Sequence, residues 1–299
     1  MNFSSLLVFA VGMVWCSAGI TVLSARRKNC SIPHFYFLGS LWAAFILGLY
    51  LFVSGEGAML RIAQWPLITM IACGAAVNGL GQAVIMWNLK SGSSALVYAI
   101  PQLGFIIPFL ASGLFWGEKI TWLNLTGVLI EACAIILLFT NGKDRSPDMA
   151  AERKRLLIAL GAFLLLGFSQ LFYIYPSLPQ NAALKLPASA SSFFSLFTNM
   201  LSFLVIMLSG KKNLPVSWRI QIPFSLAWGT IAAAAFFILF HTFRLMGENG
   251  QAGLVYPIAS STEILLFTLF TRVRLKERLS NRQFVALTVI VIGIFMIKL

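Results

Sequence analysis

The chain has 299 residues, of which 59% are hydrophobic and only 10% are charged, against about 25% charged residues in an average soluble domain. A soluble protein of this length would need many more polar side chains to cover its surface, so the composition excludes that class and indicates a polytopic membrane protein. The net charge is +13. Its basic residues are spread over several loops without interleaved aromatic residues, which excludes a nucleic-acid groove.

Ten apolar segments follow one another along the chain, each about long enough to cross a bilayer as a helix. The segments lack the period-two alternation of barrel strands, and helices satisfy all their backbone groups in lipid. The first segment has no basic residue before it, which favours a membrane helix over a secretory signal. The predicted helices cover residues 4–23, 35–54, 65–87, 95–116, 123–140, 156–175, 188–209, 222–245, 253–271 and 283–297.

The end of the chain repeats an earlier stretch. Residues 96–98, Leu-Val-Tyr, return at residues 254–256, and the polar corner at residues 117–121 returns at residues 276–280. The offset is 158 residues at the first match and 159 at the second. A duplication of this size determines the architecture before any residue is assigned a role.

The longest polar segment, residues 141–155, separates the two copies and is predicted to be a cytoplasmic linker. Five helices in each half, residues 1–140 and 156–299, mean that the second copy enters the membrane from the opposite side. We therefore predict an all-α polytopic membrane protein with ten transmembrane helices in two inverted five-helix repeats. Most of the 22 basic residues fall in loops after odd-numbered helices. These loops are expected in the cytoplasm, which places both termini outside.

A family resemblance follows from the two corners. The run Gly117-Glu118-Lys119-Ile120-Thr121, followed by Gly127 and Ala134, resembles the signature of EamA-type carriers of the drug/metabolite transporter superfamily. The second copy has Ala286 and Gly293 in the same places, and Trp15 is similar to the element that opens such repeats. The resemblance implies a ten-helix carrier that moves small metabolites by alternating access. It would be a multi-pass protein of the bacterial inner membrane, a monomer or homodimer without a cofactor.

Two carboxylates, Glu131 and Glu263, fall inside predicted spans. A charge at the bilayer centre costs between about 2.5 and 17 kcal/mol, so each is a functional candidate. Glu131 shares a helical face with Gly127 and Ala134, and this small-residue face is expected to pack against another helix. Glu131 is then either a coupling group that titrates with protons or a neutral acid that is hydrogen-bonded between helices.

Glu263 lies six residues after Pro257 and shares a helical face with Tyr256 and Ser260. We expect it to face a central cavity and to couple transport to protons; the alternative is a core acid neutralised by a neighbour such as His241. His241 is itself either a proton relay or a packing residue.

A substrate site is expected where the halves meet, with aromatic walls and a few placed polar groups. Gln170 and Asn199 add polar groups to it from the sixth and seventh helices. The candidate substrate-binding residues are Trp15, Asn78, Gln82, Tyr98, Gln102, Tyr173, Tyr256 and Ser260.

These features predict a secondary active transporter for a small organic metabolite. The leading version is a proton-coupled exporter of an amino acid or related compound. The alternatives are an uptake permease for a sugar or other neutral solute and a non-transporting membrane scaffold. The chain has no Walker loop, no GxSxG, no HExxH and no Cys/His spacing for a metal, so we expect neither an enzyme nor a metal site. The expected partners are the substrate, the lipid bilayer and protons.

Overall fold

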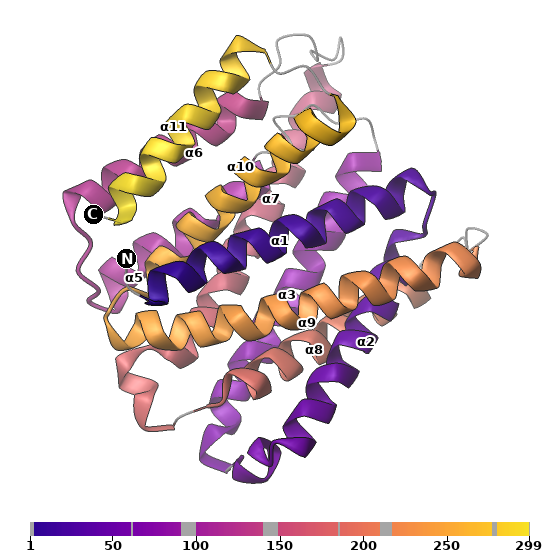
Figure 1. The fold of residues 1–299 in the computed structure, drawn as a ribbon, viewed down its shortest axis with the longest axis vertical. Coiled ribbons are helices and arrows are strands. Elements are labelled where there is room, and N and C mark those ends of the chain that lie inside the picture. Colours follow the sequence, from indigo (N-terminus) through magenta and orange to yellow (C-terminus); the bar gives the residue numbers. More distant parts are fainter. Residues whose placement is uncertain are drawn as a thin grey trace.

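The computed structural model describes residues 3–60, 62–90, 100–139, 149–184, 186–209, 217–276 and 280–298. All regular structure within these ranges is helical (Figure 1). The α-helices are α1 (Phe3–Arg27), α2 (Ile32–Val53), α3 (Trp65–Lys90), α5 (Ile106–Phe115), α6 (Trp122–Phe139), α7 (Met149–Ile174), α8 (Ala188–Ser209), α9 (Trp218–Glu248), α10 (Val255–Leu275) and α11 (Asn281–Lys298). Short 3-10 helices connect or precede them: η1 (Glu56–Met59), η2 (Ile62–Gln64), η3 (Leu103–Phe105), η4 (Tyr175–Ser177), η5 (Pro179–Leu184) and η6 (Ala252–Leu254).

Seven helices in the described part of the chain are long and apolar enough to cross a membrane. Three further apolar helices, Ile100–Phe115, Trp122–Leu138 and Asn281–Ile297, are shorter. Large apolar side chains cover the outside of the molecule; Phe52 is 84% exposed and Trp122 is 82% exposed. Because water would disfavour such a surface, the chain is a polytopic helical membrane protein. Each of the ten predicted segments overlaps one of these helices, and the number of membrane crossings stays a prediction.

Helices from the first half of the chain pack mainly against helices from the second half. Helix α1 lies between α9 and α10, α2 packs on α8 and α9, and α3 packs on α7 and α8 (Figure 1). Helices α6 and α11 pair closely at one edge and reach the other helices through α10. The core is therefore built between the halves.

Helices α6 and α11 begin with the same capping arrangement. The backbone N–H of Thr121 donates to Asn124 Oδ1 at 2.9 Å, and the backbone N–H of Asn124 donates to Thr121 Oγ1 at 3.1 Å. Ser280 and Gln283 make the equivalent pair of bonds, at 3.0 and 3.3 Å. A reciprocal cap of this type satisfies backbone N–H groups that a helix start leaves free. Thr121 and Ser280, the last residues of the polar corner and of its predicted repeat, thus both lie at helix starts.

The same two amides also join α6 to α11. Asn124 Nδ2 donates to the carbonyl oxygen of Ile297 at 2.7 Å, and Gln283 Nε2 donates to the carbonyl oxygen of Leu138 at 3.4 Å. Residues 124 and 283 are 159 positions apart, and so are residues 138 and 297. Each bond is therefore the counterpart of the other under the offset seen in the sequence.

Candidate functional site

An aromatic cluster joins helices α1, α7, α9 and α10 in the interior. The indole of Trp15 stacks on the ring of Tyr256, with centroids 5.9 Å apart and planes 26° apart. Tyr256 also meets Phe243 at 5.2 Å, Phe243 meets Phe240 at 6.1 Å, and Phe240 meets Tyr173 edge-on at 5.6 Å. Because Trp15 is partly exposed and both tyrosines are buried, the cluster has one accessible wall.

Helix α8 adds a polar contact to this cluster. Ser195 Oγ donates to the hydroxyl oxygen of Tyr173 at 3.1 Å, and Ser195 has no exposed surface. A buried tyrosine hydroxyl needs a partner, and Ser195 provides it. This hydrogen bond joins α7 to α8 at Tyr173 and Ser195.

Glycines bring α3 close to both of these helices. A Cβ placed on Gly74 would lie 2.7 Å from Phe172 Cβ on α7, and one placed on Gly79 would lie 2.8 Å from Ser202 Cβ on α8. Asn78, four residues after Gly74 and one before Gly79, lies between these two faces of the helix. Asn78 therefore faces the junction of α7 and α8 and keeps part of its surface exposed.

Two amide oxygens at this junction have no hydrogen-bond partner. They are Asn199 Oδ1 on α8 and Gln170 Oε1 on α7, and both atoms are buried. Asn199 as a whole is 4% exposed. Most buried polar atoms are hydrogen-bonded, so unpaired acceptors at a helix junction indicate a possible ligand contact.

The remaining substrate candidates lie near this region or outside the described residues. Gln102 is partly buried just before η3, where a Cβ on Gly104 would lie 3.1 Å from the backbone nitrogen of Gly167 on α7. Gln82 is partly exposed on α3, and Ser260 is buried on α10. Tyr98 lies outside the described residues.

Glu263 faces α1. A Cβ on Gly19 would lie 3.8 Å from Glu263 Oε1, and the thiol of Cys16 lies within electrostatic range of the carboxyl group. Glu263 is partly exposed. It lies seven residues beyond Tyr256, or roughly 10 Å along the axis of α10. The carboxyl group is therefore at the contact between α1 and α10, beyond the aromatic cluster.

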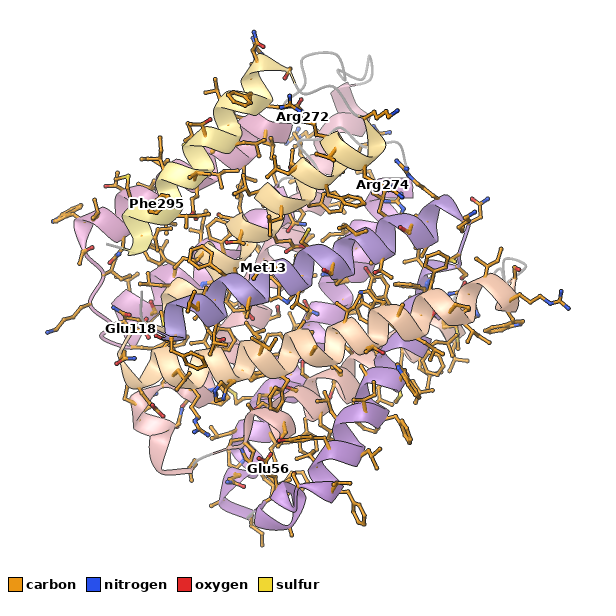
Figure 2. The ribbon with its side chains drawn as sticks, viewed as in Figure 1. Met13, Glu56, Glu118, Arg272, Arg274 and Phe295 are labelled. Atoms are coloured by element: carbon orange, nitrogen blue, oxygen red, sulfur yellow. The ribbon has the colours of Figure 1, made fainter. Side chains whose placement is uncertain are left out.

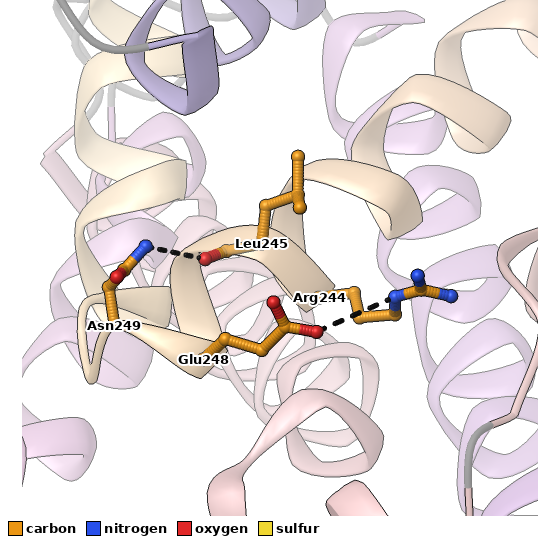
Figure 3. Close-up of polar contacts among 4 residues, drawn as sticks. All are labelled: Arg244, Leu245, Glu248 and Asn249. Carbon is orange, nitrogen blue, oxygen red and sulfur yellow. Dashed lines mark hydrogen bonds and ion pairs between the residues drawn. The ribbon is translucent and has the colours of Figure 1, made fainter.

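His241 and Arg244 belong to another face of α9. The interior face carries Phe240 and Phe243, and Arg244 turns outward, half exposed, with its Nε 3.8 Å from Glu248 Oε1 (Figure 3). Asn249 Nδ2 donates to the carbonyl oxygen of Leu245 at 2.9 Å beside this pair. His241 is partly exposed. Since α1 lies between α9 and α10, the structure does not bring His241 next to Glu263.

Glu131 is enclosed where α6 crosses α11. It has no exposed surface, and a Cβ on Gly293 would lie 2.5 Å from Glu131 Cγ. Both carboxyl oxygens, and Oγ of Ser261 on the neighbouring α10, lack a partner at good hydrogen-bond geometry, but the hydroxyl lies close enough to the carboxyl group to interact with it. The small-residue face predicted around Glu131 therefore packs on α11, away from the aromatic cluster.

Glu118 makes a contact between the halves that the sequence analysis did not predict. Its two carboxylate oxygens accept hydrogen bonds from the backbone N–H groups of Ala252, at 2.8 Å, and Gly253, at 2.9 Å. Glu118 thereby caps η6, which leads into α10, and lies at the end opposite Arg272 and Arg274 (Figure 2). An anionic cap is favourable at a helix N-terminus. Glu118 belongs to the repeated polar corner, but the sequence did not indicate its partners, Ala252 and Gly253, because they are distant along the chain.

Ser195, Phe240 and Phe243 were also missed as site residues. The chain has 26 phenylalanines, and serines recur in many of its apolar segments, so no local pattern distinguishes these three. Only their contacts with Tyr173 and Tyr256 reveal them.

Comparison with known proteins shows the fold alone. No protein-family profile matches the chain, and no curated protein is significantly similar to it. A crystal structure of a protein is similar over 99% of this chain and 97% of its own, with a TM-score of 0.71 and 17% sequence identity. The helical arrangement therefore occurs, over its whole length, in an experimentally determined structure.

Proposed function

We propose that this chain is a secondary carrier that moves a small organic metabolite across the bacterial inner membrane by alternating access. The leading version is a proton-coupled exporter of an amino acid or related compound, as in EamA-type carriers. The observation that carries the proposal is the aromatic and polar cluster at the junction of the halves. Its buried, unpartnered amide oxygens lower stability unless they serve a ligand.

The inverted repeat is part of the same proposal. Its support is the pair of counterpart hydrogen bonds, from Asn124 to Ile297 and from Gln283 to Leu138. A carrier built from such repeats binds its substrate at their interface and exposes it to either side by moving one repeat against the other. The aromatic cluster, with Trp15 from one half and Tyr256 from the other, lies at that interface.

Close packing at one end of the molecule supports alternating access. A Cβ on Gly253 would overlap Ser112 on α5, and Glu118 bonds to the backbone of the same turn. Such an end is closed to a substrate while these contacts persist. We interpret this end of the molecule as a gate that is closed in one transport state. In the other transport state, α5 and η6 would have to separate.

Glu263 is the proposed coupling group. A carboxyl group at a contact between helices of the two halves can exchange protons when those helices move.

The test is transport of a mixture of radiolabelled amino acids by the purified chain in proteoliposomes with an imposed pH gradient. We expect gradient-driven flux that Glu263→Gln reduces at least tenfold. Flux that is intact and still pH-dependent in this variant would show that Glu263 does not couple transport. Loading the label inside or outside the vesicles separates export from uptake. No flux of amino acids or sugars in either direction would contradict the carrier proposal.

A further inference from the structure

We propose that Asn78, Gln170 and Asn199 form a subsite that binds hydrogen-bond donors of the carried molecule, such as ammonium, amide or hydroxyl groups, in preference to anionic groups. The inference rests on the proposed carrier function and narrows its substrate class. It follows from geometry, unpaired acceptors and the placement of charge.

The three amides lie at one level of the helix bundle. The hydrogen bond between Tyr173 and Ser195 joins α7 to α8. Along α3, Gly74 meets Tyr173 and Gly81 meets Leu166, so α7 runs antiparallel to α3.

Helix α8 runs parallel to α3. Trp65 at the start of α3 contacts Phe194, and Gly79, further along α3, contacts Ser202, which is further along α8. Gln170 and Asn199 therefore lie about one turn from the Tyr173–Ser195 bond in the same direction. A Cβ on Gly79 would lie 3.5 Å from Asn199 Oδ1, which sets Asn199 at the height of the adjacent Asn78.

The unpaired oxygens determine what the subsite attracts. Asn199 Oδ1 and Gln170 Oε1 are buried acceptors without a donor in the protein. A buried acceptor recovers its lost hydration only when a donor reaches it, so a ligand that brings N–H or O–H groups gains from both atoms. A ligand with acceptors alone leaves them unpaired.

The charges around the cluster disfavour an anion. On α9, Arg244 lies on another face than Phe240 and Phe243, is half exposed and is paired with Glu248 (Figure 3). It therefore offers no counter-charge to an anionic group next to the amides, and burying such a group without one is costly. The chemistry fits a neutral or cationic amine, amide or alcohol.

The probes are phenylalaninamide, which is cationic and rich in donors, and N-acetylphenylalanine, which is anionic and has the same ring. The purified full chain in detergent is titrated with each, and the melting temperature is recorded. We expect phenylalaninamide to raise the melting temperature at concentrations where N-acetylphenylalanine has no effect. Equal stabilisation by both probes, or stabilisation by neither, would overturn the proposal.

Asn199→Leu removes one unpaired acceptor and keeps the number of side-chain heavy atoms. We expect it to weaken phenylalaninamide binding at least tenfold while the melting temperature without ligand stays the same or rises, since an unpaired buried acceptor lowers stability. Asn199→Asp restores an acceptor and is expected to restore or strengthen binding of this cation. Asn249→Leu, at the exposed end of α9, is the matched control with unchanged binding.

A purely structural role for Asn199 gives the opposite result: a lower melting temperature without ligand and unchanged binding. Flux assays keep this inference separate from the carrier proposal. If the wild-type chain binds phenylalaninamide but transports nothing, the subsite stands and the carrier function fails. If it transports only anionic solutes, the carrier function stands and the subsite fails.

Discussion

Glu131 on α6 has no exposed surface, whereas Glu263 on α10 keeps part of its surface accessible. Glu131 is enclosed by the α6–α11 crossing, where glycine brings the two helices into contact. Glu263 lies against α1, across the junction between the halves. The duplication offset sharpens the contrast, because the counterpart of Glu131 is the buried Ile290 and the counterpart of Glu263 is the buried Phe105.

The two acids differ in whether their surroundings suit a carboxyl group that exchanges protons. A fully buried carboxyl group in a small-residue crossing is expected to remain a neutral acid, because a charge there would be desolvated and its neighbour on α10 is the uncharged hydroxyl of Ser261. A carboxyl group between helices that move relative to each other, as the proposed carrier function requires of α1 and α10, would be exposed differently in each state. We therefore interpret Glu131 as a packing residue and retain Glu263 as the coupling candidate.

The largest expected effect comes from breaking the α6–α11 crossing with Gly127→Leu. Even a Cβ at this position would lie 2.7 Å from Ile297 Cγ1 and 2.9 Å from the carbonyl oxygen of Gly293. The helices must separate, at a cost near the upper end of about 1–3 kcal/mol. Fluorescence-detected size exclusion after heating measures the loss. Gly161→Leu on α7 is the control, because a Cβ there has no neighbour within 4 Å. Equal stability of the two variants would contradict the packing described for this crossing.

The second prediction compares the two acids directly. Glu263→Gln should remove the pH dependence of flux, since an amide cannot exchange the coupling proton, and should lower gradient-driven flux at least tenfold, or about 1.4 kcal/mol. Glu131→Gln should leave the pH dependence unchanged. Proteoliposome flux at several pH values measures both. A loss of pH dependence in Glu131→Gln alone would reverse the two assignments.

The third prediction concerns the anionic cap of η6. Glu118→Gln keeps the shape of the side chain but has only one oxygen that can accept. One charge-assisted hydrogen bond becomes a neutral one and the other is lost, because an amide NH2 group cannot accept from a backbone N–H; the cost is roughly 1 kcal/mol. We expect a melting temperature lower by a few degrees and a gate that opens more readily. The opening is measured as faster modification of a cysteine substituted at Ser112. Unchanged melting and modification would show that the cap contributes nothing to closure.

The smallest effect is expected at the outer end of α9. Arg244→Ala removes an ion pair whose side chains are more than half exposed, and such pairs contribute about 0–1 kcal/mol. Melting temperature and flux should both stay close to the wild-type values. A large loss of flux with normal melting would instead indicate that Arg244 contacts the substrate.

Much of the fold was predictable because the bilayer imposes a simple rule on sequence. An apolar run of about 20 residues must form a helix in lipid, so all ten predicted segments overlap helices. The similar polar corners in the sequence are the sites of the matching caps, Thr121 with Asn124 and Ser280 with Gln283. The candidate site was less predictable, because the sequence around Ser195, Phe240 and Phe243 does not indicate which helix each side chain contacts.

Composition alone was enough for the helical membrane class, because long apolar runs form helices in lipid. The duplication, from an offset along the chain, and the two acids within membrane spans stay predictions. Only the tertiary structure decided that Glu131 is enclosed, that Glu118 caps η6 and that Asn78 faces the junction of α7 and α8. The reason is physical. Hydrophobic burial in lipid depends on each segment alone, whereas hydrogen bonds and close helix crossings depend on partners more than a hundred residues away.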